Sequence, residues 1–130
     1  MPYSRLFYHF IWTTKRRLPL ISETNRAIIY GAIVAKVEQV NGIIHALNGM
    51  EDHLHLVATV PPTLALSKFI GQVKGVSSLA ASRATADEFA WQEEYGVLSV
   101  SESQLDSVIH YVKLQQEHHR GKTLDPLFEP

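Results

Sequence analysis

The sequence predicts an α+β protein with a ferredoxin-like (RRM-like) antiparallel sheet, helices packed on that sheet, and a further helix near the C-terminus. The first observation is the order of segments, which reads strand, helix, strand, strand, helix, strand, helix. A split strand–helix–strand pair of this kind gives an antiparallel sheet covered by helices. The second is size, since 130 residues with 45% hydrophobic side chains suit one domain over residues 1–130.

Each segment is assigned from its periodicity and its boundary residues. Alternating apolar side chains indicate strands, and apolar side chains at helical spacing indicate helices. Ser22 can cap the first helix and Gly42 can end it, while Pro61 and Pro62 end a strand. The expected elements are a strand over 3–14, a loop over 15–21, a helix over 22–41, strands over 43–50 and 53–60, a helix over 63–84, short strands over 89–92 and 97–100, and a helix from Ser101 or Ser103 to 119.

Composition excludes several classes of protein. The chain has no cysteine, so it has neither disulfides nor a thiolate site, which is compatible with a cytoplasmic location. It has no apolar run of about 18 residues, so no membrane span is expected. The net charge is −1, without the basic excess usual in proteins that hold nucleic acid. Basic residues are nevertheless grouped locally, and we consider Lys15, Arg16, Arg17 and Lys74 as candidate contacts to a DNA backbone.

A His-x-His pair lies within the predicted strand 53–60. Because side chains alternate along a strand, His53 and His55 project from one face and Leu54 from the other. Two imidazoles whose backbone origins are about 7 Å apart can converge on one metal ion. The alternative is a chance pair in which one ring only hydrogen-bonds at the strand surface. A cupin-like or metallo-β-lactamase-like site is disfavoured, because residues 56–60 lack the carboxylate or histidine that those sites need.

The last predicted helix carries a polar face beside its apolar one. Tyr111, Gln115 and His118 are spaced i, i+4 and i+7, so they share a face that could be directed at the histidine pair. The alternative makes Tyr111 a boundary aromatic with its hydroxyl in water, and His118 a residue of a solvated helix end. The competing Tyr95 precedes Gly96 in a predicted loop and is interpreted as structural. The apolar face consists of Leu105, Val108, Ile109 and Val112.

Several segments together resemble the single-tyrosine transposases of the HUH superfamily, REP-associated tyrosine transposases included. His53-Leu54-His55 fits the histidine–apolar–histidine motif that gives the superfamily its name. Two departures are Glu51, where the family usually has proline, and the missing basic excess. The other similar segments follow the family's order: residues 8–17, 49–56, 74–78, 91–96, 99–101, and the helix with Tyr111, Val112, Gln115, His118 and His119.

The resemblance implies a fold, a mechanism and partners. It implies a ferredoxin-like core and a DNA transposase that cuts and rejoins single-stranded DNA through a 5′-phosphotyrosine on Tyr111. It implies that His53, His55 and Gln115 bind a divalent metal ion, Mg²⁺ or Mn²⁺. The implied partners are single-stranded DNA with hairpins near element ends, and a second copy of the chain in a homodimer.

Two rival functions stay open at this point. The first is a non-catalytic nucleic-acid binder on the same sheet, although the glycine-flanked aromatic motifs of RNA-recognition domains are absent. The second is a domesticated or inactive family member that serves the host as a binder of single-stranded DNA or palindromes. Retention of Tyr111, His53, His55 and Gln115 argues against complete decay.

Overall fold

The computed structural model describes residues 5–85 and 88–115. Within these residues a four-stranded sheet and three α-helices account for the regular structure, with two short 3₁₀ turns. The predicted α+β class is therefore confirmed. The elements are β1 (Phe7–Thr13), η1 (Lys15–Arg17), α1 (Arg26–Gln39), β2 (Ile43–Gly49), β3 (His53–Thr59), α2 (Leu66–Thr85), β4 (Gly96–Val100), η2 (Glu102–Gln104) and α3 (Leu105–Lys113).

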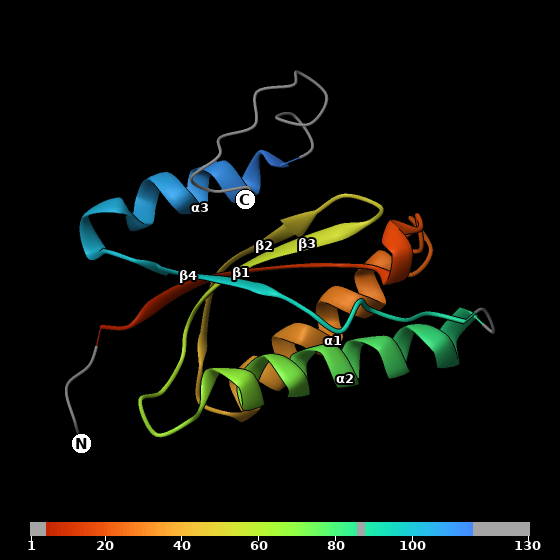
Figure 1. The fold of residues 1–130 in the computed structure, drawn as a ribbon, viewed down its shortest axis with the longest axis horizontal. Coiled ribbons are helices and arrows are strands. Elements are labelled where there is room, and N and C mark those ends of the chain that lie inside the picture. Colours follow the sequence, from red (N-terminus) through yellow and green to blue (C-terminus); the bar gives the residue numbers. More distant parts are fainter. Residues whose placement is uncertain (1–4, 86–87, 116–130) are drawn as a thin grey trace.

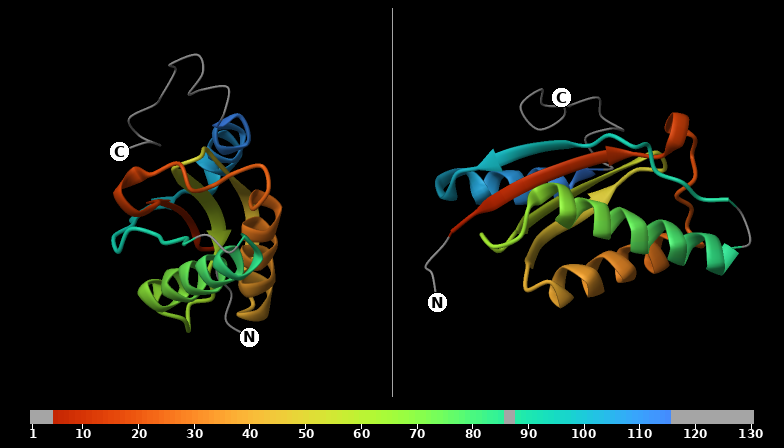
Figure 2. Two further views of the ribbon diagram at one scale, coloured as in Figure 1. Left: turned by 90° about the vertical axis from the view of Figure 1, so that its right-hand side faces the viewer. Right: turned by 60° about the horizontal axis from the view of Figure 1, so that its bottom comes forward.

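The sheet has the strand order β2-β3-β1-β4, and every neighbouring pair is antiparallel. This is the order that a split strand–helix–strand repeat produces. Helices α1 and α2 cover one face of the sheet, and α3 lies on the other (Figures 1 and 2). The two central strands, β1 and β3, thus run between helical layers. Their side chains alternate between a thick apolar core and the α3 side.

The main core lies between the sheet and the pair α1–α2. Alternate residues of the central strands, such as Phe10 and Leu56, are completely buried there. Burial of this apolar surface is the principal stabilising term for the fold. The residues that share this core include Phe10, Trp12, Ile29, Ile33, Val37, Leu54, Leu56, Ala58, Phe69, Ile70 and Val73.

A smaller apolar cluster fixes α3 on the opposite face. Val108 and Val112 of α3 pack on Ala46 of β2 and Val57 of β3. The Asn48 amide also donates a 3.0 Å hydrogen bond to a backbone carbonyl near the end of α3, at Lys113. The predicted apolar face of the last helix therefore packs on the sheet, and this contact sets the rotation of α3 about its axis.

Four predicted boundaries differ from the structure. Residues 22–25 form a turn rather than helix, and α1 begins at Arg26. In this turn Ser22 and Asn25 each accept a hydrogen bond, through the side-chain oxygen, from the other's backbone nitrogen, which is the pattern of a capping box. Residues 89–92 make only one isolated bridge, between Trp91 and Thr14, rather than a strand. Residues 102–104 form a 3₁₀ turn before α3 begins. Helix α3 ends at Lys113, whereas the sequence predicts a last helix that runs to 119. Residues 3 and 4 of the first predicted strand, and residues 116–119 of the last predicted helix, lie outside the described residues.

Gly49 permits the tight turn that leads into the His-x-His strand. A Cβ atom at Gly49 would lie 2.1 Å from the carbonyl oxygen of His53 and 2.9 Å from Cα of Leu54. We expect Gly49→Ala to reduce the free energy of unfolding by on the order of 3 kcal/mol, because two backbone segments must separate. Urea unfolding followed by circular dichroism measures this change.

Gly71→Ala in α2 is the matched control, since no described atom lies within 4 Å of the position that its Cβ would take. There the substitution should stabilise the helix by about 0.5–1 kcal/mol. Equal effects of the two substitutions would contradict the close approach at Gly49.

Candidate active site

Strand alternation places the two histidines of β3 side by side beneath α3. His53 is 3% exposed and His55 is 0% exposed, and the centroids of their rings are 5.2 Å apart. Leu54, between them, points into the main core. The two imidazoles therefore project from the same face of β3, as predicted, and both rings are buried.

Helix α3 brings its tyrosine to this pair. The ring of Tyr111 lies 6.4 Å from that of His55, measured between centroids, with the planes inclined at 69°. Tyr111 is 6% exposed, and Gln115, four residues further on, is fully buried. Tyr111 thus lies on the buried side of α3, as the helical spacing predicts, whereas Gln115 lies two residues beyond the end of α3 at Lys113 and is buried there. His118 and His119 lie outside the described residues.

A third histidine, His9 of β1, belongs to the site, although the sequence pattern does not predict it as a site residue. Nε2 of His9 and Nδ1 of His55 are 2.7 Å apart and share a hydrogen bond, and His9 is 1% exposed. Strand alternation alone could have placed His9 on the face opposite Phe10. Its meeting with His55 depends on the register of β1 against β3, in which His9 is opposite Val57. That register cannot be read from the pattern of either strand.

Asp52 supports the other histidine from the turn before β3. Its Oδ1 is 2.8 Å from Nδ1 of His53, and its Oδ2 is 3.4 Å from Nε of Arg17. Burial by itself raises the pKa of the Asp52 carboxyl. The hydrogen bond and charge of His53, together with the Arg17 guanidinium, lower this pKa by more than burial raises it. The net pKa lies below its ordinary value of 3.8. The folded state therefore favours the ionised carboxylate.

The lowered pKa of Asp52 predicts a pH-dependent stability. A carboxyl with a lower pKa in the folded state contributes stability above its unfolded pKa and loses it as the pH falls through the folded value. Relative to Asp52→Asn, the wild type should be more stable near pH 7 by on the order of 1 kcal/mol. The difference should vanish as the pH falls below 3.8. Urea unfolding over a pH series measures it, and a difference independent of pH would contradict the assignment.

The predicted basic contacts fall into two groups. Lys15, Arg16 and Arg17 are exposed in η1, beside the turn that holds Asp52, where the backbone nitrogen of Thr14 donates to the Asp52 carbonyl. They lie near the end of β3 that carries His53, so they stay candidates for contacts to a phosphate backbone.

Lys74 is differently placed. Its ammonium donates to the backbone carbonyl oxygens of Gln92, Glu93 and Glu94, at 2.5, 3.0 and 3.3 Å. Burial lowers the pKa of Lys74, and the charge of Glu93 partly opposes this. This geometry favours a structural role, in which Lys74 fixes the segment before β4.

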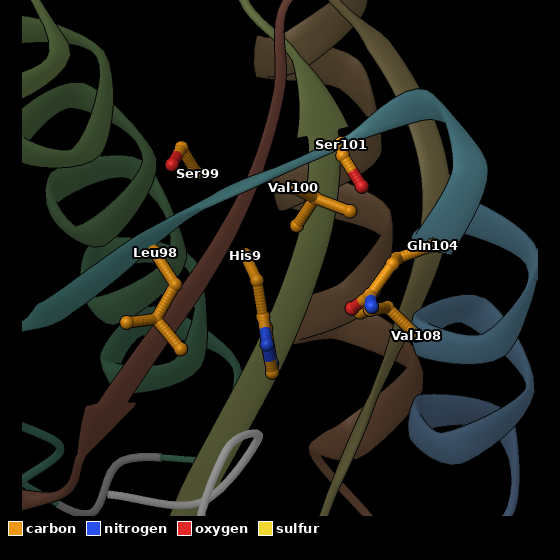
Figure 3. Close-up of a pocket in the computed structure, with 7 residues that line it drawn as sticks. All are labelled: His9, Leu98, Ser99, Val100, Ser101, Gln104 and Val108. Carbon is orange, nitrogen blue, oxygen red and sulfur yellow. The ribbon is translucent and has the colours of Figure 1, made fainter.

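A cavity of about 350 Å³ adjoins the histidine cluster (Figure 3). In Figure 3, the side chains of Leu98 and Val100 project from β4 toward His9, and Gln104 and Val108 approach from the α3 side. The cavity therefore lies on the same face of the sheet as His53 and His55, with His9 in its wall. Its lining residues are His9, Leu98, Ser99, Val100, Ser101, Gln104 and Val108.

The residues of the site include nitrogen and oxygen donors of the kinds that divalent cations accept. Within residues 5–85 and 88–115, no three His, Cys, Asp or Glu side chains form a metal-binding group. A site here would therefore combine the imidazoles of His53 and His55 with the amide oxygen of Gln115. Since Nδ1 of each imidazole is engaged by Asp52 or His9, Nε2 is the atom through which each could bind. These ligands are neutral, so the cation would keep its charge for a phosphate.

A ferredoxin-like sheet that carries a His-x-His strand under a tyrosine-bearing helix is the arrangement expected of the HUH superfamily. Comparison with protein families identifies the group within it: residues 2–115 match the family described as "Transposase IS200 like". The chain therefore belongs to the IS200-like transposase family. The predicted resemblance is confirmed.

Individual relatives agree with this assignment. The transposase of insertion sequence IS200 from Salmonella typhimurium is 36% identical over 74 residues, which are 55% of this chain and 47% of that protein. That match thus spans about half the length of the relative. The ISDra2 transposase TnpA from Deinococcus radiodurans is 25% identical over 128 residues, with 87% of this chain and 86% of that protein covered.

A solved structure shares the fold. The REP-associated tyrosine transposase bound to a REP hairpin superposes with a TM-score of 0.70 at 16% identity, covering 92% of this chain and 74% of the other.

No helix among the described residues is long and apolar enough to cross a membrane.

Proposed function

We propose that the protein is a single-tyrosine DNA transposase that cuts and rejoins single-stranded DNA with the help of Mg²⁺ or Mn²⁺. The observation that carries this proposal is the position of Tyr111 beside His55 of the same chain, with ring centroids 6.4 Å apart. Family membership supports a transposase, and the cluster supplies both a nucleophile and a set of metal ligands. We also propose that the protein acts in the cytoplasm.

The proposed reaction begins with attack by the Tyr111 hydroxyl oxygen on the phosphorus of a phosphodiester. A bond forms between that oxygen and phosphorus, the bond from phosphorus to the 3′-oxygen breaks, and the phenolic proton is transferred to solvent while the leaving oxygen gains one. A divalent cation, when bound, polarises the phosphate and offsets its developing charge. A phenol is mostly protonated at neutral pH, so the fixed position of Tyr111 contributes much of the rate.

The product explains how strands can be rejoined without ATP. The 5′-phosphotyrosine keeps the energy of the phosphodiester, so a 3′-hydroxyl can attack it and release Tyr111. One tyrosine holds one DNA end, and transposition must handle two ends. We therefore propose a homodimer that contributes two active sites.

The proposed DNA partner is a single strand that carries a hairpin. The REP-associated transposase with this fold is bound to a REP hairpin, which motivates the choice of a hairpin substrate here. The exposed turn with Lys15, Arg16 and Arg17 would contact the backbone near the cleavage site. The overall net charge of −1 means that this attraction must be local.

Covalent capture tests the proposal. A labelled single-stranded oligonucleotide with a hairpin is incubated with the protein and Mn²⁺ or Mg²⁺, and DNA-linked protein is sought on a denaturing gel. We expect a metal-dependent adduct together with a strand that ends in a free 3′-hydroxyl. DNA binding without an adduct in either metal would instead support the alternative of an inactive, domesticated binding protein.

A further inference from the structure

His9, the third histidine of the cluster, is hydrogen-bonded to His55 and takes no part in the reaction proposed above. His9 lies on β1 and contacts His55 diagonally across the strand pair, because Ile11 is the residue directly opposite His55. The ring centroids of His9 and His55 are 5.0 Å apart, and Nε2 of His9 is 2.7 Å from Nδ1 of His55. Both side chains are at most 1% exposed. This hydrogen bond is therefore shielded from water.

The chemistry of imidazole fixes what such a bond requires. In a neutral imidazole one nitrogen carries a proton and donates, and the other accepts. If His55 binds a cation through Nε2, that nitrogen has no proton, so the proton is on Nδ1. Nδ1 of His55 then donates to Nε2 of His9, and His9 must carry its own proton on Nδ1.

We propose that His9 is a positioning residue, whose Nε2 accepts a hydrogen bond from Nδ1 of His55 and so fixes the tautomer and ring orientation that present Nε2 of His55 to the metal ion. This inference rests on the proposed function, since it takes His55 to be a metal ligand. His9 itself is a supporting residue rather than a third ligand, because its Nε2 is engaged by His55 and no three-histidine metal group occurs among the described residues.

The same arrangement recurs at the neighbouring ligand. Nδ1 of His53 is 2.8 Å from the Asp52 carboxylate, so each proposed ligand is held at Nδ1 by a second polar side chain. Metal-binding histidines commonly make such a bond through the nitrogen that does not bind the metal. The Asp52 carboxylate, in the turn before β3, thus orients His53, and the His9 imidazole, on β1, orients His55.

Burial makes the partner of His55 important. With an apolar side chain at position 9, Nδ1–H of the buried His55 would lose the acceptor that His9 provides. The ring could then move its proton to Nε2, which cannot bind a cation in that form. Loss of such a supporting partner typically weakens metal affinity by about 10- to 100-fold.

The test has one readout that needs no metal. Imidazole ¹H–¹⁵N correlation spectra of the wild type without metal should show His55 and His9 both protonated on Nδ1. In His9→Phe, which fills the same space, His55 should shift toward the tautomer protonated on Nε2. A wild-type spectrum with His55 protonated on Nε2 would overturn the proposal, whatever the variants do.

Metal affinity supplies the second readout. Mn²⁺ binding, measured by electron paramagnetic resonance, should weaken about 10- to 100-fold in His9→Phe. His9→Gln, whose side-chain oxygen can accept the bond, should stay closer to wild type, and it also carries the test if His9→Phe does not fold. The control is His45→Phe, because His45 shares a 2.7 Å hydrogen bond with Thr59 at the far end of the sheet, and it should not change Mn²⁺ affinity.

The outcomes separate the two proposals. Wild-type affinity in both His9 variants, with binding that still depends on His53, would overturn the role of His9 alone. A wild type that binds no Mn²⁺ would overturn the proposed metal site, and the role of His9 with it.

Discussion

Tyr111→Phe is expected to eliminate the covalent DNA adduct, with a loss of more than about a thousandfold relative to the wild type. The substitution removes only the phenolic oxygen, which is the proposed nucleophile. It keeps the aromatic ring that lies 6.4 Å from His55, so the packing of α3 on the sheet should be preserved. Denaturing gels with labelled hairpin DNA measure the adduct, and circular dichroism verifies the fold.

Tyr95→Phe is the matched control for that experiment. Tyr95 lies just before β4, 36% exposed, with its ring 6.5 Å from Phe10, which belongs to the main core beneath α1 and α2. It is therefore on the other side of the sheet from the histidine pair, and its loss should leave the adduct intact. An adduct that survives in Tyr111→Phe but disappears in Tyr95→Phe would show that Tyr95, and not Tyr111, is the nucleophile.

Local patterns were sufficient to predict one half of the site. The alternation of β3 determines that His53 and His55 share a face, and the helical period determines that Tyr111 lies on the buried side of α3. Both statements concern residues within one element, where side-chain direction follows from backbone geometry. The apolar face of α3 then packs on β2 and β3, which brings Tyr111 to His55.

The other half of the site depends on how elements meet. His9 reaches His55 only through the register between β1 and β3, and the sequence of neither strand specifies that register. The ammonium of Lys74 binds loop carbonyls, which a count of basic residues cannot foresee. Ser22 makes the cap-type bond that its position predicts, accepting from the backbone nitrogen of Asn25, but the regular helix α1 begins only at Arg26.

His53→Ala is expected to have the second largest effect, a fall in adduct formation of on the order of 10²–10³-fold. A bound cation contributes several kcal/mol to stabilising a phosphoryl transition state, and each 1.4 kcal/mol corresponds to about tenfold in rate. Loss of one of two imidazole ligands should also weaken Mn²⁺ binding. His45→Ala removes an imidazole from β2 of the same sheet and serves as the control, with both quantities expected at wild-type values.

The metal dependence of the two variants separates their causes. His53→Ala keeps Tyr111, so a large excess of Mn²⁺ should restore part of its adduct formation by filling the weakened site. Tyr111→Phe has no nucleophile, and no concentration of metal should restore it. If His53→Ala reacts like the wild type at low Mn²⁺, the imidazole of His53 binds no catalytic cation. The tight pairing of its Nδ1 with Asp52 would then serve only the stability of the turn before β3.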